Sequence, residues 1–318
     1  MRLRCLVTVV APCILALKAP NESEQTVYSV GDLHGDFDRF KLILERLGLA
    51  SFEDGVKWTG GTSILVSTGD SVDRGEHGRA IYLGFQALAE QAPKHGGEVV
   101  NILGNHELMN LQGDLRYVHD SEFRNGGDYG GRKIREREWS KTGLIGGDIR
   151  NRYVGAAIRG GSLFVHGGLD ARVMETFGQN PIYELNSRLR KLLNADVVTH
   201  NHQLLGSRGP FWNRFFAEGG ETQVCQRIEE TLQRVGADRM VLGHTPQTEG
   251  VAVRCVKPEG PRIILADTVI SRAYEPAFGF SRPSAVEYRG NQVTALYFPE
   301  GTSEPQRVLL SLGSRQEM

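Results

Sequence analysis

The stretch that decides the fold is Gly-Asp-Ser-Val-Asp-Arg-Gly at residues 69–75, which closely follows the apolar run Ile64–Ser67. A short run of β-branched and aliphatic residues bounded by turn-forming residues is typical of a buried strand. The glycines at both ends allow sharp backbone turns, so the carboxylates between them can point inward. This pattern indicates a site at the carboxyl end of a strand, where open α/β sheets bind their ligands.

Four other strand-like runs also end in polar clusters. The runs are Thr26–Val30, Val99–Leu103, Ser162–Val165 and Arg239–Leu242, and the clusters begin at Gly31, Gly104, His166 and Gly243. A single Asp at such a place is more often a helix N-cap, and a single His is more often a core residue. Five clusters at strand ends should converge on one place, and their Asp, His and Asn side chains suit divalent metal ions.

Helical patterns separate these runs. The segments with apolar residues on one face are Phe37–Leu47, Gly78–Glu90 and Gln223–Val235. Strands that alternate with such helices predict an α/β sandwich. A polar, Arg- and Gly-rich stretch interrupts the alternation, and we expect it to form an inserted helical and loop cap over about residues 111–160.

Strand-like runs return after the last helical pattern. They are Ile263–Ala266, Ala285–Tyr288 and Val293–Tyr297. No linker divides the chain, so we expect a single domain over residues 26–300, followed by a C-terminal tail over residues 301–318.

The order of the clusters resembles a known family. Asp-x-His, Gly-Asp-x-x-Asp-Arg, Gly-Asn-His-Glu, His-Gly-Gly and Gly-His follow one another as in the metallophosphoesterase fold, and more narrowly as in the PPP phosphoprotein phosphatases. The stretches at residues 105–118 and 208–214 are similar to the Shewanella-like branch of that family. The resemblance covers Thr26 to about Thr268 and implies a metallophosphoesterase-type β-sandwich flanked by helices.

The resemblance also implies two divalent metal ions. The first would be held by Asp32, His34 and Asp70, and the second by Asp70, Asn105, His166 and His244. A bridging carboxylate lets two cations lie about 3.5–4 Å apart, and a water or hydroxide between them would attack phosphorus directly. Manganese is the expected metal, with iron or zinc as alternatives, because all these ligands are oxygen or nitrogen donors.

Other residues gain roles from the same resemblance. His106 would be the general acid for the leaving oxygen, and Asp73 would orient it. Arg74 would bind the phosphate with its planar fork, with Asn105 beside it. Either Arg208 or Arg214 would supply a second phosphate contact, and Arg208 is slightly favoured.

The chain departs from the type 1 and type 2A enzymes near Phe211, where their Ser-Asp-Pro segment is missing. The regulatory docking known for those enzymes therefore does not transfer, and regulatory partners are unknown. We expect Phe211 and Trp212 to pack in the core. Asp114 and Arg116 are expected to support the site or the cap, and pairing of Asp114 with an arginine is at least as well supported as substrate contact.

The composition excludes several classes of protein. The 318 residues carry 37 Lys and Arg against 38 Asp and Glu, a formal net charge of -1. A nucleic-acid binder would show a basic excess, so no nucleic-acid partner is expected. The hydrophobic fraction of 40% excludes global disorder.

The N-terminus resembles a targeting segment. Arg2 and Arg4 precede the apolar run Cys5–Leu17, which is too short to span a bilayer as a helix, so no stable membrane span is expected. This order predicts a signal peptide over residues 1–20 and a secretory or extracellular location, with an organellar location as the alternative. Of the remaining cysteines, Cys225 and Cys255 are expected to be buried free thiols, although one bridge between them is possible.

The expected function is hydrolysis of phosphate monoesters on phosphoproteins, at either Ser/Thr or Tyr. A small-molecule or dinucleotide-polyphosphate hydrolase of the same fold is one alternative. A catalytically silent protein that binds phosphorylated ligands is another, but such a protein should have lost a metal ligand or the His-Asp pair, and this sequence retains them all.

Overall fold

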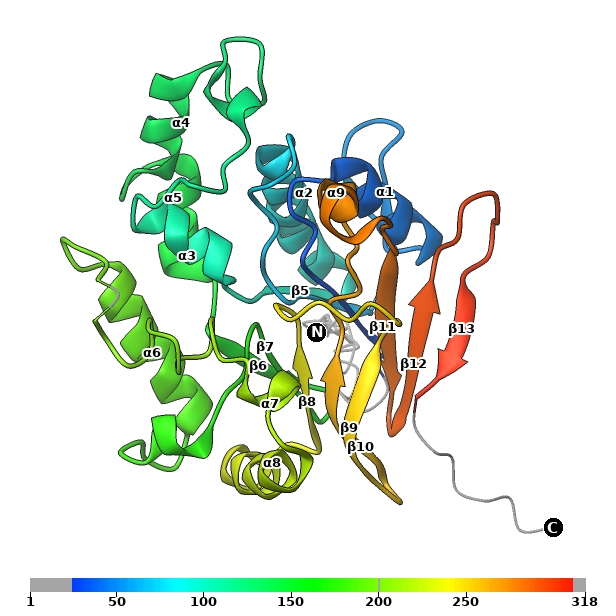
Figure 1. Ribbon diagram of the computed structural model, residues 1–318. Helices are drawn as coiled ribbons and strands as arrows, with labels where there is room; N and C mark the ends of the chain where they lie inside the picture. Colours follow the sequence, from blue (N-terminus) through cyan, green and yellow to red (C-terminus); the bar gives the residue numbers. More distant parts are fainter. Residues whose placement is uncertain (1–24, 200, 311–318) are drawn as a thin grey trace, which may run out of the picture.

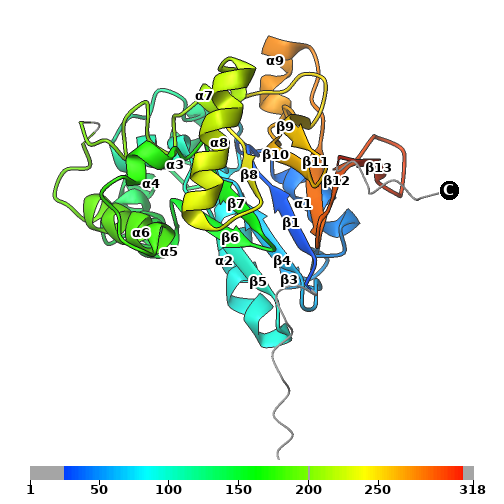
Figure 2. The same ribbon diagram turned by 90° about the horizontal axis from the view of Figure 1, so that it is seen from below.

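Two β-sheets pack face to face at the centre of the molecule, and helices cover their outer faces (Figure 1, Figure 2). The computed structural model describes residues 25–199 and 201–310. The arrangement confirms the predicted α/β sandwich. The predicted targeting segment, residues 1–20, lies outside the described residues.

The first sheet has six strands in the order β13-β12-β11-β1-β4-β5. They are β1 (Val27–Val30), β4 (Ile64–Ser67), β5 (Glu98–Asn101), β11 (Ser284–Arg289), β12 (Gln292–Tyr297) and β13 (Gln306–Leu309). Strands β1, β4 and β5 run parallel. Their carboxyl ends therefore lie at the same edge of the sheet.

The second sheet has five strands in the order β6-β7-β8-β10-β9. They are β6 (Ala156–Arg159), β7 (Ser162–Val165), β8 (Arg239–Leu242), β9 (Ala252–Lys257) and β10 (Gly260–Leu265). Strands β7, β8 and β10 are parallel. A two-stranded ribbon, β2 (Ala50–Ser51) with β3 (Lys57–Trp58), lies apart from both sheets.

The core between the sheets is formed by side chains from the inner faces of both. Val66 and Val286 from the first sheet lie in one apolar cluster with Phe164, Val241 and Ile264 from the second, and all five are fully buried. Burial of one such side chain contributes about 1.5–3 kcal/mol. This core joins the sheets rigidly, so loops at their ends keep fixed relative positions.

Helices pack on the outer faces. The first sheet is covered by α1 (Phe37–Arg46) and α2 (Gly78–Gln91), and the second by α6 (Pro181–Leu193) and α8 (Glu221–Val235). Shorter helices are α3 (Asn105–Leu111), α7 (Phe215–Glu218) and α9 (Glu275–Phe278). Helix α1 confirms the predicted amphipathic pattern, because it buries Phe40, Ile43 and Leu44 on one face.

The insertion is a helical cap that lies beside the sandwich (Figure 1). It contains the 3₁₀ turn η3 (Asp120–Phe123), α4 (Arg132–Trp139) and α5 (Leu144–Arg152). The predicted end at residue 160 is too late, because β6 begins at Ala156 and pairs with β7. The apolar residues of this edge strand belong to the second sheet.

Two predictions outside the cap need correction. Cys225 and Cys255 are joined by a disulfide with a Cα–Cα distance of 5.3 Å, and they are not free thiols. The bond links α8 to the edge strand β9. Part of the predicted C-terminal tail forms β13, which pairs with β12. Among the residues that the structure describes, no helix has the length and apolarity that a membrane crossing requires.

Candidate active site

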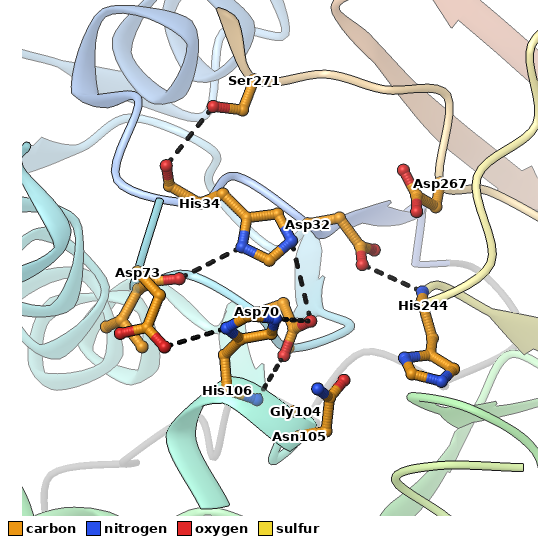
Figure 3. Close-up of polar contacts among 12 residues, drawn as sticks. Asp32, His34, Asp70, Asp73, Gly104, Asn105, His106, His244, Asp267 and Ser271 are labelled. Carbon is orange, nitrogen blue, oxygen red and sulfur yellow. Dashed lines mark hydrogen bonds and ion pairs between the residues drawn. The ribbon is translucent and has the colours of Figure 1, made fainter. Parts of the chain in front are cut away.

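The five polar clusters meet where β1, β4, β7 and β8 end and α3 begins. Figure 3 shows side chains from the clusters of Asp32, Asp70, Asn105 and His244. Of eight described non-glycine residues with positive φ, six are predicted site residues. These six are Asp32, His34, Asp70, Asp73, Arg74 and His244. A backbone of this kind costs roughly 1–3 kcal/mol per residue and persists only where the surroundings enforce it. Backbone strain is therefore concentrated at the site.

Two glycines allow the loops to approach each other. A Cβ on Gly69, which has φ +96°, would lie 2.7 Å from the backbone of Gly104. A Cβ on Gly35 would lie 2.5 Å from the backbone of Gly75. Both contacts are too short for any side chain, so glycine is required where the loops cross.

Asp70 lies at the centre of the site. Its Oδ2 atom is 3.3 Å from His166 Nε2 and 3.7 Å from His34 Nε2. Two groups of possible ligand atoms include Asp70, and within each group all the atoms lie within 4.8 Å of one another. His34, Asp70 and His106 form the first group, and Asp70, His166 and His244 form the second. Asp70 belongs to both groups, as a bridging ligand should.

The histidines present the nitrogen that a metal needs. His34 Nδ1 donates to the carbonyl oxygen of Val72 at 3.2 Å, and His166 Nδ1 donates to that of Thr68 at 2.8 Å. A hydrogen bond of this kind fixes the ring and leaves Nε2 to face the cluster. His244 Nε2 is buried and has no hydrogen-bond partner within the described residues.

The other two predicted ligands also reach the site. Asp32 Oδ1 accepts the backbone N–H of His244 at 2.9 Å, while its Oδ2 is buried and has no partner among the described residues. Asn105 Oδ1 is 2.8 Å from His166 Nε2. The six predicted ligands therefore lie in one region, but the tight group around His34 and Asp70 contains His106 in place of the predicted Asp32.

The protonation states agree with this picture. Burial lowers the pKa of His34 well below its usual value and that of His244 to about 2, so both rings are neutral at pH 7 and can bind a metal. Burial also disfavours charge on His166, but the Asp70 carboxylate outweighs it and raises that pKa to about 9. The Asp70 carboxylate therefore favours a positive charge next to it, which is either a proton on His166 or a bound cation.

Two buried carboxylates were not assigned roles from the sequence. Glu107 accepts the backbone N–H groups of Gly104, Asp70 and Ser71, at 2.7–3.0 Å, and so joins the start of α3 to the Asp70 loop. Burial and the nearby Asp70 raise the pKa of Glu107 to about 7. Asp267 lies near Asp32 (Figure 3), and burial raises its pKa to about 6. Its position just after β10 is the signal that could have found it.

His106 and Asp73 form a buried pair. His106 Nδ1 donates to Asp73 Oδ2 at 2.9 Å, and the opposite ring nitrogen, Nε2, lies 3.9 Å from Asp70 Oδ2. Burial disfavours the charged ring, but Asp70 and Asp73 outweigh it and raise the pKa of His106. The ring can therefore carry a proton on the nitrogen that faces the cluster.

Arg74 lies between two tyrosine rings that sequence reasoning did not assign to the phosphate site. Its guanidinium carbon is 4.6 Å from the ring centre of Tyr117 and 4.8 Å from that of Tyr274. Arg74 Nε is buried and has no hydrogen-bond partner within the described residues. Tyr274 also reaches the cluster, since its hydroxyl is 3.0 Å from His34 Nε2. The two rings hold the cationic guanidinium of Arg74 in a position that suits an anion.

The two candidate arginines for a second phosphate contact have different surroundings. Arg214 Nη1 donates to the carbonyl oxygen of His244 at 3.1 Å, which places it at the edge of the site. Arg208 is exposed, and no hydrogen bond or ion pair joins it to the cluster within residues 25–199 and 201–310. The geometry thus places Arg214, rather than the slightly favoured Arg208, beside the candidate ligands.

The remaining predicted residues have structural surroundings. Phe211 is fully buried in the core, as expected, and Trp212 is partly buried with its ring 6.0 Å from that of His244. Arg116 forms two hydrogen bonds with Asp114, at 2.7 and 2.8 Å. The expected pairing of Asp114 with an arginine is confirmed.

A family model described as calcineurin-like phosphoesterase matches residues 26–248. The chain belongs to this family. The phosphoesterase is 35% identical over 252 residues to an uncharacterized protein of Schizosaccharomyces pombe, covering 78% of this chain and 74% of the relative. It is 27% identical over 277 residues to Shewanella-like protein phosphatase 2 of Arabidopsis thaliana, covering 74% and 69% of the two chains.

The fold of this phosphoesterase is also similar to a solved structure. The crystal structure of a cold-active protein-tyrosine phosphatase from a psychrophilic Shewanella species matches with a TM-score of 0.72 and 24% identity, over 91% of this chain and 81% of that one. At this identity the likeness concerns the fold alone. Family and relatives support phosphatase activity, and the buried His and Asp cluster suits divalent metal ions.

Proposed function

We propose that this phosphoesterase hydrolyses phosphate monoesters on phosphoproteins with the help of two divalent metal ions. The observation that carries the proposal is Asp70, which is shared by two groups of ligand atoms. Next to it lie a His106–Asp73 pair and an arginine, Arg74, whose Nε has no hydrogen-bond partner in the described part of the chain. Metal ligands, a proton donor and an anion-binding group are the parts that phosphate ester hydrolysis requires.

The metal ions would be held as the sequence suggests. The proposed ligands are Asp32, His34 and Asp70 for one ion, and Asp70, Asn105, His166 and His244 for the other. When bound, two divalent cations would lower the pKa of a water molecule and offset the negative charge of the phosphate. Manganese remains the proposed metal, with iron or zinc as alternatives, because the donors are carboxylate, amide and imidazole.

The protein's own groups would handle the leaving group and the phosphate. His106 would give the proton on Nε2 to the leaving oxygen, while Asp73 holds the ring through Nδ1. Arg74 would bind phosphate oxygens through its free fork, with Asn105 beside it. Arg214 is the better placed candidate for a second contact, since it already contacts His244, whereas Arg208 would have to move to reach the site.

A phosphorylated protein segment is the proposed substrate. A cavity of about 380 Å³ opens beside the site, and its walls include Met109, Tyr117, Leu205 and Trp212. The apolar part of these walls suits a side chain of a peptide, and the Asp114–Arg116 pair also lines the cavity. The rings of Tyr117 and Tyr274 around Arg74 favour phosphotyrosine, because an aromatic substrate ring can pack against them.

The test compares metal content with turnover on a panel of substrates. The panel contains p-nitrophenyl phosphate, phosphotyrosine and phosphoserine peptides, and diadenosine tetraphosphate. We expect two metal ions per chain and the fastest turnover on phosphotyrosine peptides. Faster turnover of diadenosine tetraphosphate would favour the dinucleotide alternative. Binding without any turnover in the metal-loaded protein would favour the catalytically silent alternative.

A secretory or extracellular location is proposed as well. The Cys225–Cys255 disulfide supports it, because such bonds persist mainly in oxidising compartments. N-terminal sequencing of the protein from its own cells should find a start near residue 20, behind the proposed signal segment. An intact Met1 would contradict this location, and a start after a longer cleaved segment would favour an organelle.

A further inference from the structure

The charged helix α4 of the cap contains one buried arginine. Arg132 and Arg137 on this helix are exposed, but Arg135 is only 2% exposed. Arg135 Nε donates to Glu122 Oε2 at 2.7 Å, and Glu122 is also buried. A buried ion pair is costly to form, so its position calls for a physical explanation.

The second contact of Arg135 leads toward the site. Its Nη2 donates to Asn110 Oδ1 at 2.5 Å. Asn110 Nδ2 in turn donates to Asp73 Oδ1 at 2.8 Å and to the backbone carbonyl of His106 at 2.9 Å. The other oxygen of Asp73 accepts from His106. A continuous row of hydrogen bonds therefore runs from the cap to the His106 ring.

The chemistry of these groups fixes which atom donates and which accepts in each hydrogen bond. A guanidinium can only donate hydrogen bonds, so Arg135 requires the oxygen of the Asn110 amide to face it. The amide nitrogen must then face Asp73, where it donates. Both oxygens of Asp73 are thereby engaged, which fixes the carboxylate plane and keeps the proton of His106 Nδ1 directed at it. Without Arg135 the amide oxygen loses its partner, so the Asn110 side chain is less firmly held against Asp73.

The cap holds Arg135 in place from all sides. The rings of Phe123, Tyr129 and Trp139 lie 5.3–5.4 Å from its guanidinium carbon. Trp139 Nε1 donates to the Tyr129 hydroxyl at 2.8 Å, which locks two of these rings together. The arginine is therefore anchored in the core of the cap, and a firm anchor is what precise positioning requires.

We propose that Arg135 is a positioning residue, which fixes the His106–Asp73 pair through Asn110 so that His106 Nε2 faces the leaving oxygen. Arg135 of the inserted cap thus contributes to proton transfer without touching the substrate. The proposal rests on the general-acid role of His106, and it does not depend on which phosphoester is the natural substrate.

The test measures kcat for a series of aryl phosphates whose leaving groups differ in basicity. A misplaced proton donor slows most the esters whose phenolate leaving group is most basic. A general loss of structure at the site slows all the esters equally. We expect Arg135→Met to lower kcat by about 10²-fold on the most basic leaving group, as for a small misplacement of a catalytic group. The effect on p-nitrophenyl phosphate should be slight, and the metal content should not change.

The structure offers matched controls. Arg79→Met removes an arginine of α2 that pairs with Glu138 of α4 at 2.7 and 2.9 Å. Among the described residues, no hydrogen bond joins Arg79 to Asn110 or Asp73. Glu122→Gln removes the charge next to Arg135 and keeps its contact with Asn110. Both controls should leave the dependence on leaving-group basicity as in the wild type. Should Arg135→Met fail to fold, Asn110→Leu removes the same link and is expected to give the same steep dependence.

The outcomes distinguish a failure of the positioning role of Arg135 from a failure of the general-acid role of His106. His106→Asn should steepen the dependence most, and Arg135→Met in an Asp73→Asn background should add nothing further. If His106→Asn steepens the dependence but Arg135→Met does not, Arg135 only stabilises the cap and the proposal is wrong. If His106→Asn leaves the dependence unchanged, the general-acid role itself is wrong, and the positioning role is rejected with it. Loss of metal in Arg135→Met would also overturn the proposal.

Discussion

The strand-end loops and the inserted cap bring polar side chains to one place in opposite ways. In the loops, His244 Nε2 and Asp32 Oδ2 are buried without partners within the described residues, and the backbone around them is strained. In the cap, Arg135 is paired with Glu122 and enclosed by aromatic rings. The loops therefore present polar atoms that can bind a ligand, whereas the polar groups of the cap bind one another. Changes in the loops should therefore affect chemistry first, and changes elsewhere should affect stability or orientation.

The largest effect is expected from Asp70→Asn. This change keeps the shape of the side chain but removes the charge that both groups of ligand atoms share. Metal content should fall at both positions, and activity should fall to background, as elemental analysis and p-nitrophenyl phosphate turnover would show. Asp267→Asn is the matched control, because Asp267 is buried near Asp32 but lies outside both groups. Two tightly bound ions in Asp70→Asn would show that the bridging assignment is wrong.

The next effect is expected from the pair beside the ligands. His106→Asn should keep its metals but lose the proton donor, which lowers kcat on phosphoserine peptides by about 10²- to 10⁴-fold. The loss on p-nitrophenyl phosphate should be mild, since that phenolate leaves without help. Asp73→Asn should act in the same direction but less strongly. If the metals disappeared with His106, the ring would be a ligand, and the division of Asn105 and His106 into ligand and acid would have to be reversed.

The disulfide provides a change that should leave the loops untouched. Cys225 and Cys255 are 30 residues apart and join α8 to β9 on the far side of the second sheet from the first. Replacing both with Ser should lower the free energy of unfolding by about 3–4 kcal/mol, because the unfolded chain gains freedom. Urea unfolding measures this loss, and kcat/KM should stay as in the wild type. A large drop in kcat/KM would mean that the second sheet does not hold His166 and His244 independently of this bond.

The smallest effect concerns Asp36, the N-cap of α1. Burial acts to raise its pKa, but hydrogen bonds from Arg272 and from backbone amides outweigh it and hold the pKa below the usual value. Its stabilising contribution is therefore present above the unfolded pKa of about 3.9 and is lost as the pH falls through the lower folded pKa. At pH 7, Asp36→Asn should be less stable than the wild type by about 1–3 kcal/mol, and the difference should shrink in acid. A difference that stayed constant between pH 7 and pH 3 would contradict this.

The sequence predicted the site residues of the strand-end loops better than those of the cap. The proposed ligands Asp32, Asp70 and His244 each follow an apolar run, so their places at strand ends, together with the family resemblance, predicted that they lie close together. Asp267 obeys the same rule after β10, but it is not part of a longer motif and was left out. Tyr274 was not assigned to the site either, because nothing in its local sequence indicates that its ring lies against Arg74.

The parts that depend on contacts between distant segments could not be predicted. The helix that carries Arg135 is strongly charged, which is typical of a solvated surface, and its burial is decided by rings of the cap that follow no simple period. The Cys225–Cys255 bond depends on α8 lying against β9, a contact that neither cysteine's surroundings indicate. Strand β13 is short and exposed, so no apolar alternation marks it.

The hydrogen bond from the His244 N–H to Asp32 joins residues that are 212 positions apart in the chain. Contacts of such long range form late in folding, because the intervening chain must first be organised. During synthesis at about 5–20 residues per second, Asp32 leaves the ribosome roughly 10–40 s before His244 does. The site residues that follow strands of the first sheet, such as Asp32, are therefore made well before His244 of the second sheet. The proposed ions can both be held only after the two sheets have been made and joined, so their loading follows the synthesis of His244.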